Sequence, residues 1–169
     1  MEWFSEDGLD LTGSQTDFLA ALRDRAALWS HDPVCSVVFE ADEAYPFLRV
    51  GFDVIDKDRE MTLLCIGAYF KNDQAIFGQM HSQEYCLLND SVVGKEEAFG
   101  AAAELGLSVA RWIEGVLERP LVYREWSDLP SGRFREWAFA DSQIGLIASG
   151  RGLPPHLEQP GIVDAVNIQ

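Results

Sequence analysis

Hydrophobic and polar residues alternate most regularly between positions 47 and 54. Every second residue is apolar and would lie on one face of an extended chain: Leu48, Val50, Phe52 and Val54. The intervening positions form a mixed opposite face: Phe47, Arg49, Gly51 and Asp53. Because side chains of a β-strand point alternately to its two faces, this pattern predicts a strand with one buried side.

Similar β-branched and aromatic runs flank this segment and are separated from it by short polar turns. We expect strands over 34–40, 47–54, 61–70 and 75–82, with turns at 56–59 and 71–74. Consecutive strands joined by such short turns pair antiparallel. The first half of the chain therefore predicts an antiparallel meander.

Two other segments repeat their apolar residues at the spacing of a helix. In the first, Ser14 and Asp17 resemble a capping box, and apolar positions follow at intervals of three or four: Phe18, Leu22, Ala26 and Trp29. This helix should end before Asp32, because proline disfavours helical geometry in the residue that precedes it. The second segment, residues 96–118, is apolar around most of a helix and should be buried on several sides.

The remaining pattern predicts a hairpin of strands 121–126 and 133–140, followed by a short strand over 144–148. Residues 1–13 look like a loose arm, and glycine and proline make residues 150–169 an irregular tail. We therefore expect a single domain over 1–169 of the α+β class. It would contain a mostly antiparallel sheet (the meander plus the C-terminal hairpin) with two helices packed on it, in the order α-β4-α-β2 or α-β4-α-β3.

Charge sets the strongest limit on partners. The 169 residues include 28 acidic and 13 basic side chains, a formal net charge of −15. Residues 1–60 hold 14 acids and 5 bases, a net of −9, whereas residues 119–169 hold 6 acids and 5 bases, a net of −1. Such a chain repels nucleic acids and acidic membranes and attracts basic surfaces. We expect a basic protein partner that docks on the N-terminal part.

The acidic residues of the predicted hairpins are the main candidates for partner binding: Glu40, Asp42, Glu43, Asp53, Asp56, Asp58 and Glu60. They lie at the edges of two adjacent hairpins, where they could form one contiguous patch. Like charges held together cost stability, and a binding role would account for that cost. The alternative is a solvated surface that serves solubility.

The tripeptide Arg-Glu-Trp occurs twice in the predicted C-terminal hairpin. Its candidate contact residues are Arg124, Trp126, Arg135 and Trp137. Tryptophan and arginine are frequent at interface hot spots, which favours a binding patch. Cross-strand pairs of such residues also stabilise sheets, and we prefer that structural interpretation.

Catalytic chemistry has little support in this sequence. His81 and Cys86 are close in the chain, but nothing nearby marks Cys86 as an activated nucleophile. The acids of residues 53–60 lack the glycine and the downstream glutamate of a calcium loop. P-loop, dinucleotide-binding and serine-elbow motifs are absent. We expect no catalytic residue, metal or cofactor. The alternative hypothesis is an enzyme of unrecognised type that uses His81 or Cys86.

The expected compartment is the cytoplasm. The sequence has no run of about 18 apolar residues that could span a membrane, and its N-terminus is acidic where a signal peptide carries positive charge. Cys35, Cys65 and Cys86 are odd in number and lack CxxC spacing. They therefore signal neither a disulfide framework nor a zinc site.

A small, acidic α+β protein without a catalytic constellation resembles the immunity proteins that bacteria encode beside polymorphic or contact-dependent toxins. The resemblance rests on size, acidity and the order of elements. It implies that the chain binds a cognate toxin domain, often a basic nuclease or deaminase, and occludes its active site. Acidic side chains would then take the place of substrate phosphates. The alternative binding role is an acidic secretion-chaperone-like or adaptor protein that dimerises through its long helix.

Overall fold

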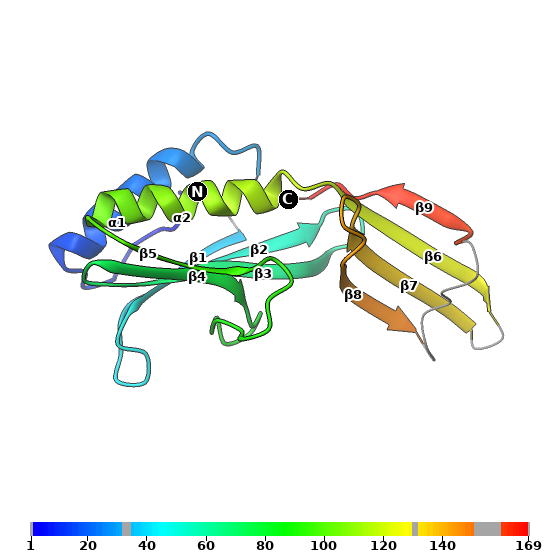
Figure 1. The fold of residues 1–169 in the computed structure, drawn as a ribbon, viewed down its shortest axis with the longest axis horizontal. Coiled ribbons are helices and arrows are strands. Elements are labelled where there is room, and N and C mark those ends of the chain that lie inside the picture. Colours follow the sequence, from blue (N-terminus) through cyan, green and yellow to red (C-terminus); the bar gives the residue numbers. More distant parts are fainter. Residues whose placement is uncertain (1, 32–34, 130–131, 151–159, 169) are drawn as a thin grey trace.

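A computed structural model describes residues 2–31, 35–129, 132–150 and 160–168. Within these residues the chain forms two helices and nine strands. The strands pair antiparallel in two sheets, and both helices lie on the same face of one of them (Figure 1). The predicted α+β class is confirmed, but the strands of the meander and of the C-terminal hairpin belong to separate sheets.

The first sheet is the predicted meander, and its order in space follows its order in the chain. Its strands are β1 (Ser36–Phe39), β2 (Leu48–Asp56), β3 (Met61–Lys71), β4 (Gln74–Met80) and β5 (Lys95–Phe99). Phe52 of β2 lies opposite Ile66 of β3, and both side chains are fully buried. The alternating pattern of β2 thus places its apolar residues in the core beneath the helices.

The two helices are α1 (Gly13–Ala26) and α2 (Ala102–Leu117). The N-cap of α1 is Thr12, whose hydroxyl accepts a hydrogen bond from the Gln15 amide while the Gln15 side chain accepts one from the Thr12 amide. The capping box predicted at Ser14 was therefore wrong by two residues, because Thr12 and Gln15 satisfy the same pattern.

The second helix begins later than predicted because residues 95–99 form β5. Glu96 of β5 lies opposite Phe77 of β4, and most of the strand is exposed at the edge of the first sheet. Two consecutive glutamates suit a helix N-terminus, but charged side chains also protect an edge strand from further pairing. The predicted order of four strands before the long helix is thus corrected to five.

The second sheet contains the predicted C-terminal hairpin and one strand that was not predicted. Its strands are β6 (Leu121–Leu129), β7 (Gly132–Phe139), β8 (Gly145–Gly150) and β9 (Ile162–Ala165). Their spatial order is β8-β7-β6-β9, so β9 returns to the far side of the hairpin. The irregular tail predicted from residue 150 was wrong for residues 162–165, whereas residues 151–159 and 169 lie outside the described residues.

The N-terminal segment is part of the core. Phe4 is fully buried, and its backbone amide donates to the Ser36 hydroxyl at 2.9 Å. The ring of Trp3 stacks on Phe52 with a centroid distance of 5.6 Å. The loose arm predicted for residues 1–13 was therefore wrong for these anchored residues, and Met1 lies outside the described residues.

The two helices approach so closely that α2 has no room for a side chain at Gly106. A Cβ at this position would lie 2.2 Å from the backbone oxygen of Phe18 in α1. Gly115 is in the same helix but has no atom within 4 Å of its own Cβ position. Alanine substitutions at these two glycines therefore separate the cost of crowding between the helices from the gain in helix propensity.

We predict opposite effects of alanine at these two glycines. Gly106→Ala should lower the free energy of unfolding by about 1–3 kcal/mol, because the added methyl group forces the helices apart. Gly115→Ala should raise it by about 0.5–1 kcal/mol, because alanine favours a helix and meets no neighbour. Urea denaturation of the three proteins measures both changes, and equal stability of the two variants would contradict the close helix contact.

Candidate functional site

The structure separates the exposed acids of the predicted patch into two groups. They are Glu40, Asp42 and Glu43 in the loop before β2, and Asp58 and Glu60 in the turn after it. The whole length of β2 lies between the groups, about 30 Å at roughly 3.4 Å per residue. The two remaining candidates, Asp53 and Asp56, have partners of their own and are described below. The seven residues therefore do not form the contiguous patch expected from the sequence.

The acidic loop, residues 40–47, projects from the first sheet between β1 and β2 (Figure 1). The side chain of Asp42 accepts a hydrogen bond from the Tyr45 amide at 2.7 Å, and the Asp42 amide donates to the Tyr45 carbonyl at 2.9 Å. Glu40 accepts from the Asp10 amide at 3.2 Å, while Glu43 is exposed. The loop thus holds three exposed carboxylates on a backbone that is closed by its own hydrogen bonds.

Arg49 supports this loop from the surface of the sheet. Its side chain is mostly buried, and its guanidinium carbon lies 4.2 Å from the ring centroid of Tyr45 and 5.0 Å from that of Phe39. It also forms an ion pair with Asp42 at 3.4 Å. Buried stacking of this kind between a cation and aromatic rings is stabilising. Sequence analysis placed Arg49 on the mixed face of its strand but gave it no role.

The loop formed by residues 81–94 covers the same face of the first sheet. Tyr85 packs on Gly51 so closely that a Cβ there would lie 2.5 Å from its ring. The Tyr85 hydroxyl donates to Asp53 at 3.0 Å, and the Tyr69 hydroxyl accepts from the Leu87 amide at 2.7 Å. Burial and the carboxylate of Asp53 raise the pKa of Tyr85. Asp53 is therefore engaged inside the protein and is a poor candidate for partner contact.

The cysteines near this face do not have the surroundings of a nucleophile. Burial and then the neighbouring Asp53 raise the pKa of the Cys65 thiol, which keeps it protonated. The Cys86 sulfur lies 3.7 Å from a carboxylate oxygen of Glu84. His81 directs Nδ1 toward the backbone amides of Gln83 and Glu84, at 3.3 and 3.4 Å. In the described structure the imidazole therefore contacts its own loop rather than the Cys86 thiol.

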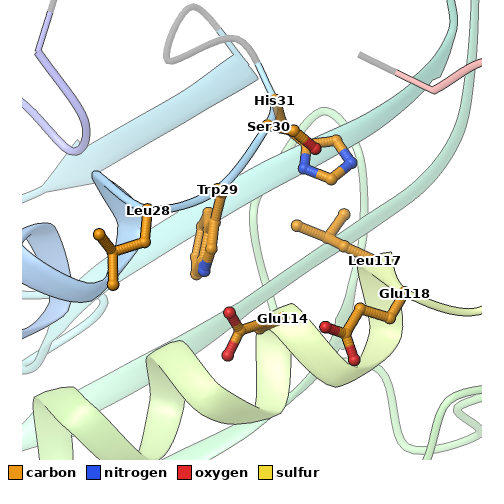
Figure 2. Close-up of a pocket in the computed structure, with 7 residues that line it drawn as sticks. All are labelled: Leu28, Trp29, Ser30, His31, Glu114, Leu117 and Glu118. Atoms are coloured by element: carbon orange, nitrogen blue, oxygen red, sulfur yellow. The ribbon is translucent and has the colours of Figure 1, made fainter.

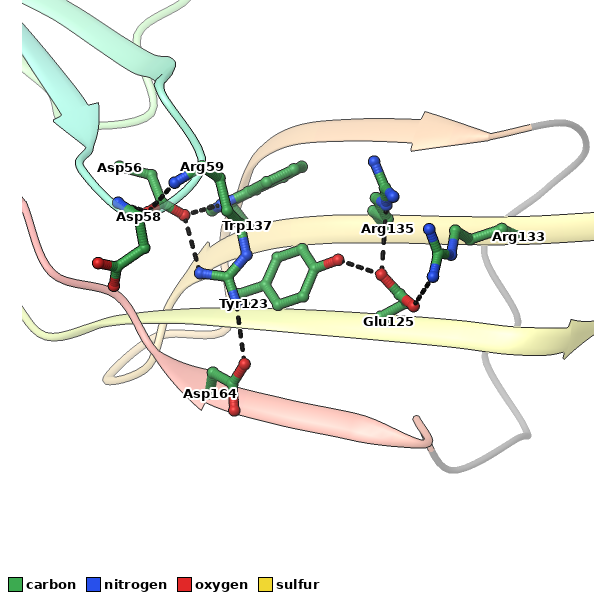
Figure 3. Close-up of polar contacts among 9 residues, drawn as sticks. All are labelled: Asp56, Asp58, Arg59, Tyr123, Glu125, Arg133, Arg135, Trp137 and Asp164. Atoms are coloured by element: carbon green, nitrogen blue, oxygen red, sulfur yellow. Dashed lines mark hydrogen bonds and ion pairs between the residues drawn. The ribbon is translucent and has the colours of Figure 1, made fainter.

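Asp56 is buried at the junction of the two sheets, and its carboxylate connects them (Figure 3). One oxygen accepts from the indole nitrogen of Trp137 in β7 at 2.8 Å and from Arg59 at 3.2 Å. The other oxygen accepts from the backbone amides of Asp58 and Arg59 and so closes the turn after β2. Arg59 also reaches Asp164 of β9 at 2.8 Å. Asp56 is therefore an internal structural residue, and its proposed place in the partner-binding surface is not supported.

A second set of charged and polar contacts continues from this junction across the second sheet (Figure 3). Arg59 lies over the ring of Tyr123, with its guanidinium carbon 3.8 Å from the centroid. The Tyr123 hydroxyl donates to Glu125, which also forms ion pairs with Arg133 at 2.9 Å and Arg135 at 3.2 Å. The hydrogen bond from Tyr123, with that from Ser127 and the two arginines, lowers the pKa of Glu125. These contacts keep the buried carboxylate of Glu125 ionised, although its partners Arg133 and Arg135 are exposed and half-buried.

The two Arg-Glu-Trp segments form cross-strand ion pairs but not a pair of tryptophans. Arg124 lies opposite Glu136 and contacts it at 3.1 Å. Arg135 is likewise opposite Glu125, whereas Trp126 is opposite Phe134 and Trp137 is opposite Tyr123. Both tryptophans are buried. The ion pairs lie across the strands as in the ladder considered from the sequence, and the buried indoles expose little surface.

A pocket of about 160 Å³ lies where the chain leaves α1 and passes the C-terminal end of α2 (Figure 2). We call it the helix-end pocket, and it is lined by Leu28, Trp29, Ser30, His31, Glu114, Leu117 and Glu118. Burial lowers the pKa of His31. Sequence analysis assigned no role to this group, because its two halves are more than 80 residues apart in the chain.

Among the described residues, no three His, Cys, Asp or Glu side chains lie close enough together to hold a metal ion. No helix in the part of the chain that the structure describes is long and apolar enough to cross a membrane.

Comparison with known proteins found no matching family model, no similar curated protein and no similar solved structure.

We predict that Asp56→Ala lowers the free energy of unfolding by about 3–5 kcal/mol, because it leaves the buried Trp137 indole without its acceptor and Arg59 with only Asp164. Asp58→Ala is the matched control in the same turn, and its exposed side chain should change stability by no more than about 0.5 kcal/mol. Guanidinium denaturation followed by tryptophan fluorescence measures both variants. An Asp56→Ala protein as stable as the control would show that the carboxylate does not hold the sheets together.

Proposed function

We propose that this chain is an acidic protein-binding module, and most specifically a bacterial immunity protein that binds a basic toxin domain and occludes its active site. It would act in the cytoplasm of the cell that it protects. The observation that carries the proposal is the acidic loop, which presents Glu40, Asp42 and Glu43 on a supported backbone. The net charge of −15 supports the choice of a basic partner.

The support beneath the loop bears directly on binding. A flexible loop would lose conformational freedom when a partner fixes it, and that loss weakens affinity. Here the turn from Asp42 to Tyr45 and the stacking of Arg49 on Tyr45 already restrict the loop. Its carboxylates can therefore meet a basic cleft with little further ordering. Such preorganisation favours a projecting, rigid recognition element.

The mechanism that we propose is competition for a positively charged active site. Carboxylates on a projecting loop can occupy the positions of substrate phosphates, since both are anionic acceptors for arginine and lysine. Long-range attraction between the two proteins would raise the association rate, and the body of the first sheet would block access of the substrate.

The adaptor alternative receives less support from the fold. We expected a secretion-chaperone-like protein to dimerise through its long helix. The apolar residues of α2 instead pack within the chain, and Gly106 lies against the backbone of α1. That face of α2 is therefore occupied in the monomer.

The proposal predicts a localised effect of charge reversal on association. The partner is captured with the tagged protein from its native host, identified, and then purified by itself. Glu40→Lys with Glu43→Lys should lower the association rate at least about tenfold at about 0.1 M salt, because steering charges are lost. The control is Asp58→Lys with Glu60→Lys, which makes the same change in net charge at the other end of β2. Stopped-flow kinetics compares the two variants with the parent.

The control should slow association by much less, and the difference between the variants should shrink near 1 M salt, where charges are screened within about 3 Å. The purified partner should also lose its own activity when the parent protein is added. An equal effect of the two double reversals would leave only a general charge effect and contradict the loop as the recognition element. A partner whose activity survives saturation with this protein would contradict the immunity role.

A further inference from the structure

The helix-end pocket is built from two segments with different chemistry. Trp29 and His31 form one wall after the end of α1, and Glu114, Leu117 and Glu118 form the other at the end of α2 (Figure 2). Its volume of about 160 Å³ is well above what a single water molecule needs. The aromatic and apolar surfaces suit the stem of a small ligand, and the carboxylates suit a charged head group.

The electrostatic character of this pocket favours a cation. The last turn of α2 carries no basic residue, although the C-terminal end of a helix has a partial negative charge. Glu118, which is exposed at the rim, adds to that charge, whereas Glu114 is already paired with Arg25 at 2.6 Å. Acidic side chains at a helix C-terminus are unfavourable by themselves. A positive group in the pocket would relieve this repulsion.

Two of the side chains that line the pocket each contain a nitrogen atom whose hydrogen-bonding capacity is not used within the described residues. Trp29 Nε1 and His31 Nδ1 are buried and have no hydrogen-bond partner among the described residues. Because burial lowers the pKa of His31, its imidazole is neutral at pH 7 and does not repel a cation. A neutral imidazole nitrogen can accept a hydrogen bond, whereas the indole N–H can donate one to a carbonyl. Tryptophan rings also attract cations.

We propose that the helix-end pocket binds an organic cation, a guanidinium or ammonium group on an aliphatic stem. The carboxylate of Glu118 attracts the head group, and Leu28 and Leu117 contact the stem. An anion would meet the Glu118 carboxylate and the negative end of α2. A purely apolar ligand would leave the acceptor nitrogen of His31 without a donor, which is costly for a buried polar group.

The test follows the indole N–H signal of Trp29 by NMR, assigned with Trp29→Phe. The probes are N-acetyl-arginine methylamide and its uncharged isostere, N-acetyl-citrulline methylamide. The arginine probe should shift the Trp29 signal saturably, with millimolar affinity because one side chain makes few contacts. The citrulline probe should shift it weakly or not at all. Equal binding of the two probes would overturn the proposal, because the charge would then make no difference.

A matched pair of glutamates locates the site. Glu118→Gln should weaken binding of the arginine probe by about two- to fivefold, as expected for an exposed charge. Glu104→Gln makes the same change in charge at the opposite end of α2 and should leave binding unchanged. Loss of binding in both variants alike, or in neither, would contradict the pocket as the binding site.

The source of the cation is distinguished by a third probe, agmatine, which has the guanidinium group but no peptide carbonyl. Tighter binding of N-acetyl-arginine methylamide than of agmatine indicates a basic residue of a protein, whose carbonyl can accept from Trp29 Nε1. Equal or tighter binding of agmatine indicates a free small cation. Both results support a cation site, and neither depends on the acidic loop, so this proposal and the proposed function can fail separately.

Discussion

A single buried carboxylate, that of Asp56, is the acceptor at which the two sheets meet. It satisfies the Trp137 indole from the second sheet and the Arg59 guanidinium from the turn of the first. Taking such charges out of water is costly, and the cost is recovered only when each group has its partners. The contact is also continuous with the core, because Trp137 packs in the same buried cluster as the residues beneath the helices. Asp56, which sequence analysis treated as part of the surface, is therefore one of the residues that hold the two sheets together, with the Arg59–Asp164 ion pair beside it.

The acidic residues of this chain fall into two classes that composition does not distinguish. Asp53, Asp56 and Glu125 each accept hydrogen bonds within the protein and serve its internal structure. Glu43 and its neighbours in the acidic loop remain exposed to solvent. The difference depends on where the donors lie. Tyr85 and Trp137 are far from their acceptors in the sequence, and Tyr123 is two residues from Glu125, on the same face of its strand. A net charge thus identifies a class of partner, but only the fold shows which carboxylates are available to it.

Strong periodicity was sufficient to predict much of the fold. The strand of residues 47–54, the hairpins around it and the long helix were all recognisable, since each spans enough residues to repeat its pattern. β5 and β9 were missed because each is short and mostly exposed, so neither has a buried face to mark it. The candidate sites could not be predicted from the sequence for a different reason. The roles of Arg49 beside Tyr45, and of Trp29 near Glu118, depend on contacts that form only in the folded chain.

The return of β9 to the second sheet has a consequence for the time course of synthesis. Arg59 and Asp164 are separated by 105 residues, yet they form one ion pair beside β6. A ribosome adds about 5–20 residues per second, so Arg59 emerges roughly 5–20 s before its partner in β9 exists. In the last part of that interval, after β6 has been synthesised, the outer edge of β6 has no neighbouring strand, and unpaired strand edges promote aggregation. The nascent chain therefore passes through a stage in which the meander can already be folded while the second sheet still needs protection.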